Sequence, residues 1–363
     1  MARSTTTTRL IDSSIRIILA GQAPTGAYIA SPNFPSYRFA WLRDGSYCAL
    51  AMDAVGRRDS AELFHDWVGS VIESQESRIL DIVARREAGH ELNVHEMLPT
   101  RYTLDGSLER DDDEPWPNFQ LDGYGTWLFA LESHYRSDLP DRLLGAVKLV
   151  ADYILAAWSL PCYDYWEEYG DRVHTSTLAS LAAGLGAAAR MLGRDDLAEA
   201  SELVMATIRE SCIVDGHFTK GPEDDRVDAS LLSLATPFGL VDPDDPVMLK
   251  TVDTVRTALA SPTGGIRRYL GDTFYGGNPW IMLTAWLGWH ERRVGLDALS
   301  ARSQAWVEAR ASEGGALAEQ VLDEPQAPDL VEFWIGKWGP VADPLLWSHA
   351  KYILMTTESE TTE

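Results

Sequence analysis

Cysteine is scarce in this sequence, with only Cys48, Cys162 and Cys212 among 363 residues. Because these residues are widely separated and odd in number, they form neither a disulfide framework nor a CxxC metal site. Positive charge is scarce as well: 31 lysines and arginines face 55 aspartates and glutamates, and the formal net charge is −24. Nucleic acids are bound through clustered lysine and arginine, and no such patch occurs, so the composition argues against a nucleic-acid partner.

Long hydrophobic runs are also absent. The sequence contains no stretch of 18 apolar residues, which predicts that no segment spans a membrane. The N-terminus, MARSTTTTRLIDSSIRIILAGQ, has neither the long apolar core nor the small-residue cleavage site of a signal peptide. We therefore expect a cytoplasmic protein. A GxSxG nucleophile elbow and a Walker lysine are missing too, which argues against serine-hydrolase and P-loop chemistry.

Helical periodicity dominates what is present. In QLDGYGTWLFALESHY, apolar residues recur on one helical face, at Leu121, Tyr124, Leu128 and Leu131. Some segments, such as NPWIMLTAWLGWH, are apolar nearly all round, whereas others, such as GRDDLAEASELVMATIRE, have one charged face. Buried inner helices surrounded by amphipathic outer ones predict an all-α, double-layered toroid. No Pro/Ser-rich linker divides the chain, so residues 1–363 are expected to form one domain, with disordered ends at about 1–8 and 356–363.

Three candidate motifs are better explained by packing or by solvent exposure. His90 and His95, beside Glu96, are five residues apart and lack the i, i+4 spacing of HExxH, so we expect no zinc site. The GxG in AGLGAAARMLG lies in an alanine-rich helical segment and indicates helix packing. His349 lies on an apolar helical segment and is interpreted as a hydrogen-bonded core histidine. The sequence therefore predicts neither a metal nor an organic cofactor.

Acids, arginines and aromatic residues gather in five loop segments. Arg43 and Asp44 illustrate the chemistry, because an arginine fork donates to sugar hydroxyls while a carboxylate accepts from them. The same pair also suits an ordinary helix N-terminus. The five segments are PNFPSYRFAWLRDGSY, EPWPNFQLDGYG, YDYWEEYGDRVHTST, GGIRRYLGDTFYGGNPW and EGGALAEQVLDEP.

In this order, the segments resemble glycoside hydrolase family 15, the glucoamylase-like inverting exo-α-glucosidases. The blocks that carry the resemblance are YRFAWLRD, WPNFQLDG, YDYWEE, RRY…DTFYGGNPW and LAEQ, and the similarity extends from about Tyr37 to about Tyr352. The fold that the resemblance implies is an (α/α)6 barrel, in agreement with the helical pattern. The implied partner is a small oligosaccharide, and the implied reaction requires no cofactor.

The resemblance also implies roles for individual residues. Glu167, which follows Trp166, matches the general acid, and Glu319 matches the general base. Glu168 matches a residue that binds sugar hydroxyls. The other residues expected to bind substrate hold the terminal glucose or form an aromatic wall at the scissile bond: Tyr37, Trp41, Arg43, Asp44, Trp116, Asp122, Trp166, Arg268 and Trp280.

The implied chemistry explains why two acids lie in different segments. Inversion requires a protonated carboxyl at the leaving oxygen and a carboxylate that activates water from the opposite side, about 6.5–9.5 Å apart. Aromatic rings around Glu167 are expected to bury it and disfavour its ionised form, whereas Glu168 is expected to be ionised and to grip the sugar.

Linkage specificity stays open at this level. Arg43 and Asp44 come early in the chain, and no starch-binding segment follows Trp347, so short α-glucosides are favoured over starch, with isomaltose foremost. An α-1,4-specific glucoamylase and a trehalase are the alternatives within the family. A catalytically silent sugar-binding barrel is an alternative of another class, although it would be expected to lack an acid or a base, and both are present. A terpene cyclase is less favoured, because DDDE at 111–114 lies in a hydrophilic loop.

Overall fold

The computed structural model describes residues 4–109 and 118–357. Its α-helices over these residues are α1 (Thr5–Ala20), α2 (Leu42–Ala54), α3 (Arg58–Ser74), α4 (Glu76–Glu87), α5 (Asp122–Tyr135), α6 (Asp141–Ala157), α7 (Thr175–Leu192), α8 (Asp195–Ser211), α9 (Pro246–Ala258), α10 (Ile281–Arg293), α11 (Asp297–Glu308), α12 (Val331–Trp338) and α13 (Leu346–Thr357). The 3-10 helices are η1 (Pro35–Tyr37), η2 (Val94–Glu96), η3 (Ala229–Leu234), η4 (Phe274–Gly276) and η5 (Pro328–Leu330). Two short antiparallel pairs complete the regular structure: β1 (Ala40–Trp41) with β2 (Arg101–Tyr102), and β3 (Ile213–Val214) with β4 (His217–Phe218).

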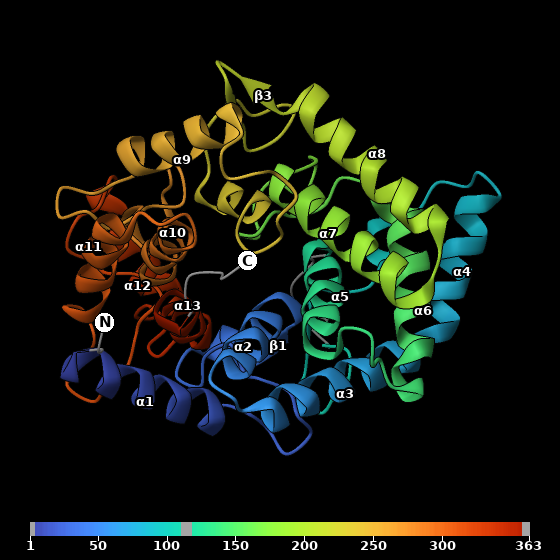
Figure 1. Ribbon diagram of the computed structural model, residues 1–363, viewed down its shortest axis with the longest axis horizontal. Coiled ribbons are helices and arrows are strands. Elements are labelled where there is room, and N and C mark those ends of the chain that lie inside the picture. Colours follow the sequence, from blue (N-terminus) through green and yellow to red (C-terminus); the bar gives the residue numbers. More distant parts are fainter. Residues whose placement is uncertain (1–3, 110–117, 358–363) are drawn as a thin grey trace.

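The helices form two concentric layers, an (α/α)6 barrel (Figure 1). In chain order the inner ring is α2, α5, α7, η3, α10 and α13; each packs on the next, and α13 closes the ring against α2. The outer layer comprises α1, α3, α6, α8, α9 and α11. Burial follows this division: α10 is buried at every position from Ile281 to Glu291, whereas α8 buries only Leu197, Val204 and Ile208. The predicted all-α toroid is confirmed.

Close packing of two inner helices explains the GxG segment. A Cβ on Gly184 of α7 would lie 2.6 Å from the Cα of Gly125 on α5, and a Cβ on Gly125 would lie 2.2 Å from the carbonyl oxygen of Ser180. Real Cβ atoms do not approach backbone this closely, so both positions require glycine. The interpretation as helix packing is confirmed.

His349 is a hydrogen-bonded core residue, as predicted. It is fully buried on α13, where Nε2 accepts from the backbone N–H of Leu317 at 3.0 Å and Nδ1 lies 2.9 Å from Ser14 Oγ. Burial lowers the pKa of His349 to about 3, so the ring is neutral and can accept that bond.

The chain ends differ from the expectation of disorder. Thr5–Thr8 belong to α1, whose first turn is capped by the Ser4 side chain, which accepts from the Thr7 N–H at 3.1 Å. Thr356 and Thr357 belong to α13, which packs against α1. Polar threonines carried no helical signal in the sequence, and this tertiary packing supplies the stability that their propensity lacks. Residues 1–3 and 358–363 lie outside the described ranges.

Within residues 4–109 and 118–357, no helix has both the length and the apolar character that are needed to span a membrane.

Candidate active site

The predicted site residues come from loops and first turns that lead into the inner helices. Trp41 ends β1 directly before α2, and Asp44 lies in the first turn of α2. Asp122 is the first residue of α5, and Trp280 precedes α10. The partial positive charge of helix N-termini favours acidic side chains, which suits a site that collects carboxylates.

Glu167 and Glu319 lie against one pair of aromatic side chains. Trp41 Nε1 donates to Glu167 Oε1 at 2.7 Å, and the Tyr37 hydroxyl donates to Glu319 Oε1 at 3.0 Å. The rings of Tyr37 and Trp41 meet edge to face, with centroids 5.6 Å apart. The structure thus brings the two acids together across 152 residues of sequence, each oriented by a different member of the aromatic pair.

Of the two acids, Glu319 is the more deeply buried, with 2% of its surface exposed. Its Oε2 accepts no hydrogen bond from the residues that the structure describes. Burial raises the pKa of Glu319 to about 7, although the Tyr37 hydroxyl and the positive charge of Arg268 lower it. Glu167, by contrast, is only half-buried, so the expectation that aromatic rings enclose it is wrong in degree.

Arg43 organises a second cluster beside these acids. Its Nη1 donates to Asp122 Oδ2 at 2.8 Å and to Gln120 Oε1 at 3.0 Å, and its Nε lies 3.4 Å from Asp44 Oδ2. Because Asp122 is fully buried, its hydrogen bond with Arg43 is shielded from water and holds the guanidinium in place. Burial raises the pKa of Asp44 to about 6, with Arg43 opposing and the nearby Glu167 carboxylate adding to the effect. The polar side chains of Arg43 and Asp44 are thus preorganised by ion pairing.

Arg268 links the neighbouring acid Glu168 to the site. Its Nη2 lies 3.1 Å from Glu168 Oε1, and the guanidinium also forms a two-point ion pair with Asp272. The Tyr269 hydroxyl donates to Glu168 Oε2. Burial raises the pKa of Glu168, and Arg268 opposes that shift. Both oxygens of Glu168 are therefore engaged by protein groups, while its side chain stays 29% exposed at the face of the site.

Two tryptophans form the wall beside Arg268. The rings of Trp166 and Trp280 are 5.6 Å apart, and the Arg268 guanidinium lies 5.5 Å from each ring centroid. Trp116, the remaining predicted aromatic residue, lies outside the described residues, as does DDDE at 111–114.

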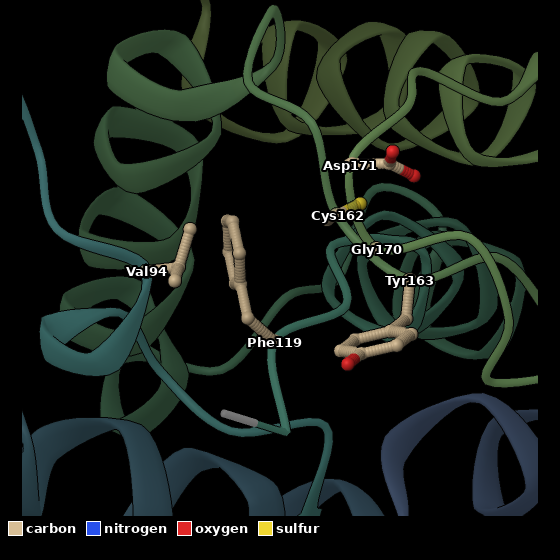
Figure 2. A pocket seen from close by; sticks show the side chains of 6 residues that line it. All are labelled: Val94, Phe119, Cys162, Tyr163, Gly170 and Asp171. Carbon is tan, nitrogen blue, oxygen red and sulfur yellow. The ribbon is translucent and has the colours of Figure 1, made fainter. Parts of the chain in front are cut away.

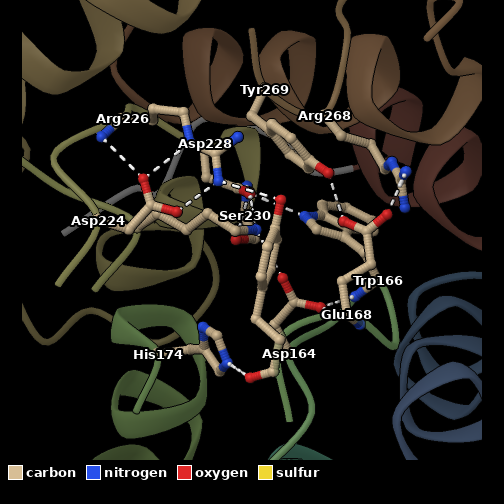
Figure 3. A network of polar contacts seen from close by, with 12 residues as sticks. Asp164, Trp166, Glu168, His174, Asp224, Arg226, Asp228, Ser230, Arg268 and Tyr269 are labelled. Atoms are coloured by element: carbon tan, nitrogen blue, oxygen red, sulfur yellow. Dashed lines mark hydrogen bonds and ion pairs between the residues drawn. The ribbon is translucent and has the colours of Figure 1, made fainter. Parts of the chain in front are cut away.

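Sequence reasoning missed three buried residues behind this wall: Asp164, Lys220 and Asp228. Trp166 Nε1 donates to Asp228 Oδ2 at 2.8 Å (Figure 3). Lys220 bridges Asp228 to Asp164. Asp164 stands in the YDYWEE block and could have been singled out there. Lys220 and Asp228 lie in a polar loop, TKGPEDDRVDAS, where no motif marks them.

A cavity of about 340 Å³ opens beside the site but contains none of its acids (Figure 2). Tyr163 and Phe119 face it from the segments just before Asp164 and Gln120, and the Tyr163 N–H donates to the Phe119 carbonyl at 3.0 Å. Its lining comprises Val94, Phe119, Cys162, Tyr163, Gly170 and Asp171.

The sequence matches the profile of glycosyl hydrolases family 15 over residues 8–332. The chain belongs to glycoside hydrolase family 15. One relative, isomaltose glucohydrolase of Kribbella flavida, is 39% identical over 352 residues, which cover 94% of this chain and 90% of that protein. The family resemblance drawn from the five sequence blocks is confirmed.

Solved structures agree with the family 15 assignment. A glycosidase variant in complex with glucose superposes with a TM-score of 0.91 at 36% identity and covers 98% of both chains. A bacterial glucoamylase complexed with acarbose shares the fold, with a TM-score of 0.75 at 23% identity, and this chain spans 55% of its length. The chain is thus a glycoside hydrolase with an (α/α)6 barrel and a small sugar as its substrate.

Proposed function

We propose that this family 15 enzyme removes the non-reducing terminal glucose of short α-gluco-oligosaccharides, isomaltose foremost, and releases β-glucose. The observation that carries the proposal is the placement of Glu167 and Glu319 against the same Tyr37–Trp41 pair. Isomaltose is favoured because an isomaltose glucohydrolase is 39% identical to this chain, and the match covers 94% of this chain and 90% of that protein. We further propose that the whole chain acts as a single catalytic domain.

In the proposed reaction, Glu167 gives its proton to the glycosidic oxygen as the bond from that oxygen to C1 breaks. Glu319 takes a proton from water as the water oxygen bonds to C1 from the opposite side, which inverts the anomeric centre. A base is most effective when its pKa lies near the working pH, so a pKa of about 7 suits Glu319 for this role. Arg43, Asp44 and Arg268 would hold the hydroxyls of the non-reducing terminal glucose.

The test is a proton NMR time course with isomaltose, maltose, panose and trehalose. β-Glucose appearing first from isomaltose supports both the inversion and the linkage. β-Glucose from maltose or trehalose instead would retain the mechanism and replace the substrate by that of a glucoamylase or a trehalase. Early α-glucose, or no hydrolysis of any of them, would refute the proposal, and the latter result is what a silent sugar-binding barrel predicts.

Two substitutions test the roles of the acids. Glu167→Gln and Glu319→Gln should each reduce kcat on isomaltose by at least about 10²-fold, because each removes a proton-transfer group. Glu87→Gln on the exposed end of α4 is the matched control and should leave kcat unchanged. Substantial activity in either site variant would show that the assignment is wrong.

We also propose a cytoplasmic location. Cys48, Cys162 and Cys212 are all buried, free thiols, as is usual for proteins of a reducing compartment. Cell fractionation with an antibody against the chain tests this, and recovery outside the cytoplasmic fraction would contradict it.

A further inference from the structure

Asp164, Lys220 and Asp228 form a buried ion triad next to the loop that carries Glu167 and Glu168. Figure 3 shows its two carboxylates near Trp166 and Glu168. Lys220 Nζ is 2.6 Å from Asp164 Oδ2 and donates to Asp228 Oδ2 at 2.7 Å. All three side chains are at most 3% exposed. Lys220 Nζ also lies 4.4 Å from the centroid of Tyr269, whose hydroxyl donates to Glu168. The reaction proposed above uses none of the three charges directly.

Asp164 fastens the backbone of the acid loop. Its Oδ1 accepts from the N–H groups of Trp166 and Glu168, both at 2.9 Å, and its carbonyl oxygen accepts from the N–H of Glu167 at 3.0 Å. Glu167 has φ 63°, in the left-handed region that a residue with a side chain adopts only at a cost. The bonds to Asp164 hold the loop in this conformation and thereby set the direction of the Glu167 side chain.

Asp228 holds the same loop from its side-chain end. Its Oδ2 accepts from Trp166 Nε1 at 2.8 Å, and its Oδ1 accepts from the N–H of Ser230 at 2.8 Å. Trp166 is therefore tied at its backbone by one carboxylate and at its indole by another. Lys220 is the group that joins these two carboxylates.

We propose that Lys220 is a positioning residue for the acid step: its ammonium holds Asp164 and Asp228 together as carboxylates, and through them it aims the Glu167 carboxyl at the leaving oxygen. This inference rests on the proposed function. Two neighbouring buried carboxylates cannot both stay ionised without a cation. Without Lys220, one of them takes up a proton or turns away, and a bond to the acid loop is lost.

Removal of the Lys220 charge should therefore impair proton donation by Glu167. Isomaltose releases a sugar hydroxyl, which needs a proton as the bond breaks, whereas α-glucosyl fluoride releases fluoride, which departs with little proton assistance. Both substrates place the same glucose in the site. The ratio of their kcat values therefore distinguishes a misplaced Glu167 carboxyl, which affects isomaltose alone, from damage to the glucose site or the fold, which affects both substrates.

The experiment compares kcat for both substrates in the wild type and in Lys220→Met, which keeps a side chain of similar length and removes the charge. We expect kcat on isomaltose to fall by about 10²-fold or more, as for a catalytic group displaced by about 1 Å, and kcat on α-glucosyl fluoride to fall by less than about tenfold. Equal losses on both substrates, or no loss on isomaltose, would overturn the inference. Absence of wild-type activity on both substrates would instead refute the proposed function.

Matched variants cover the risk of misfolding. If Lys220→Met does not fold, Asp228→Asn takes its place, since it keeps the side-chain volume and removes one charge of the triad. It should show the same selective loss of kcat on isomaltose, and equal losses of kcat on both substrates would overturn the inference as well. Arg256→Met removes the cation that pairs with another buried acid: Arg256, 28% exposed, has its Nε 3.0 Å from Glu291 on α10, away from the acid loop. It should lower the melting temperature and leave the ratio of the two kcat values unchanged.

Discussion

Glu319 should make the protein less stable than it would be without this charge. The group is 2% exposed, and its pKa of about 7 in the folded protein lies above its ordinary value of 4.5. Below about pH 4.5 both folded and unfolded chains hold the proton, and the group contributes no difference. As the pH rises from 4.5 to 7, the unfolded chain loses the proton first, so folding becomes less favourable, and the full cost is present above about pH 7. Glu319→Gln, which cannot ionise, should therefore stabilise the protein at pH 8.

The size of the effect follows from the shift. A difference of about 2.5 pKa units at 1.36 kcal/mol each corresponds to about 3 kcal/mol. An unfolding entropy of about 2.1 cal/mol/K per residue amounts to about 0.76 kcal/mol/K for 363 residues. The melting temperature of Glu319→Gln should thus exceed that of the wild type by about 4 °C at pH 8, while its activity is lost.

Differential scanning calorimetry at pH 8 and pH 4.5 measures this gain. The gain should be largest at pH 8 and should nearly vanish at pH 4.5, where the wild-type carboxyl is protonated. Glu87→Gln, on the surface, should shift the melting temperature by less than 1 °C at both pH values, since surface substitutions usually change stability by under about 0.5 kcal/mol. A gain that does not depend on pH, or a loss of stability at pH 8, would refute the reasoning.

The remaining predictions concern pH dependence, ion pairing and packing. Because Glu319 must be ionised to act as a base, kcat/KM on isomaltose should fall about tenfold per pH unit below pH 7, and a pH profile flat from 5 to 8 would contradict the role. Asp272→Ala removes the two-point ion pair of the Arg268 guanidinium, which is 2% exposed, and should destabilise the fold by about 3–5 kcal/mol in urea unfolding. An unchanged midpoint would count against a structural role for this pair. Gly125→Ala should lower the melting temperature strongly, because the added Cβ would clash with the α7 backbone. Gly336→Ala on α12, where no atom lies within 4 Å of the added Cβ, should be neutral or slightly stabilising. Equal effects of the two substitutions would be inconsistent with the packing described.

Sequence alone was sufficient for the all-α fold class and the reaction class. Periodicity identified four buried positions in and directly before α5, namely Leu121, Tyr124, Leu128 and Leu131, because positions that face a core recur with the helical repeat. It also identified His349 as a core residue. It did not show that α5 is buried on its other sides as well. Through the family resemblance, the blocks YDYWEE and LAEQ singled out Glu167 and Glu319, two acids that the structure brings to one aromatic pair.

Only the tertiary structure decided which acid is buried and what holds the other in place. Glu319 receives its hydrogen bond from Tyr37, 282 residues away, and Glu167 receives its bond from Trp41, 126 residues away. Lys220 reaches Asp164 from a polar loop that resembles any solvated turn. Burial and charge pairing are sums over everything that packs around a group, and these neighbours come from distant segments. The local sequence pattern therefore predicts which helical positions are buried, whereas the pKa of Glu319 and the orientation of Glu167 depend on the tertiary packing of the barrel.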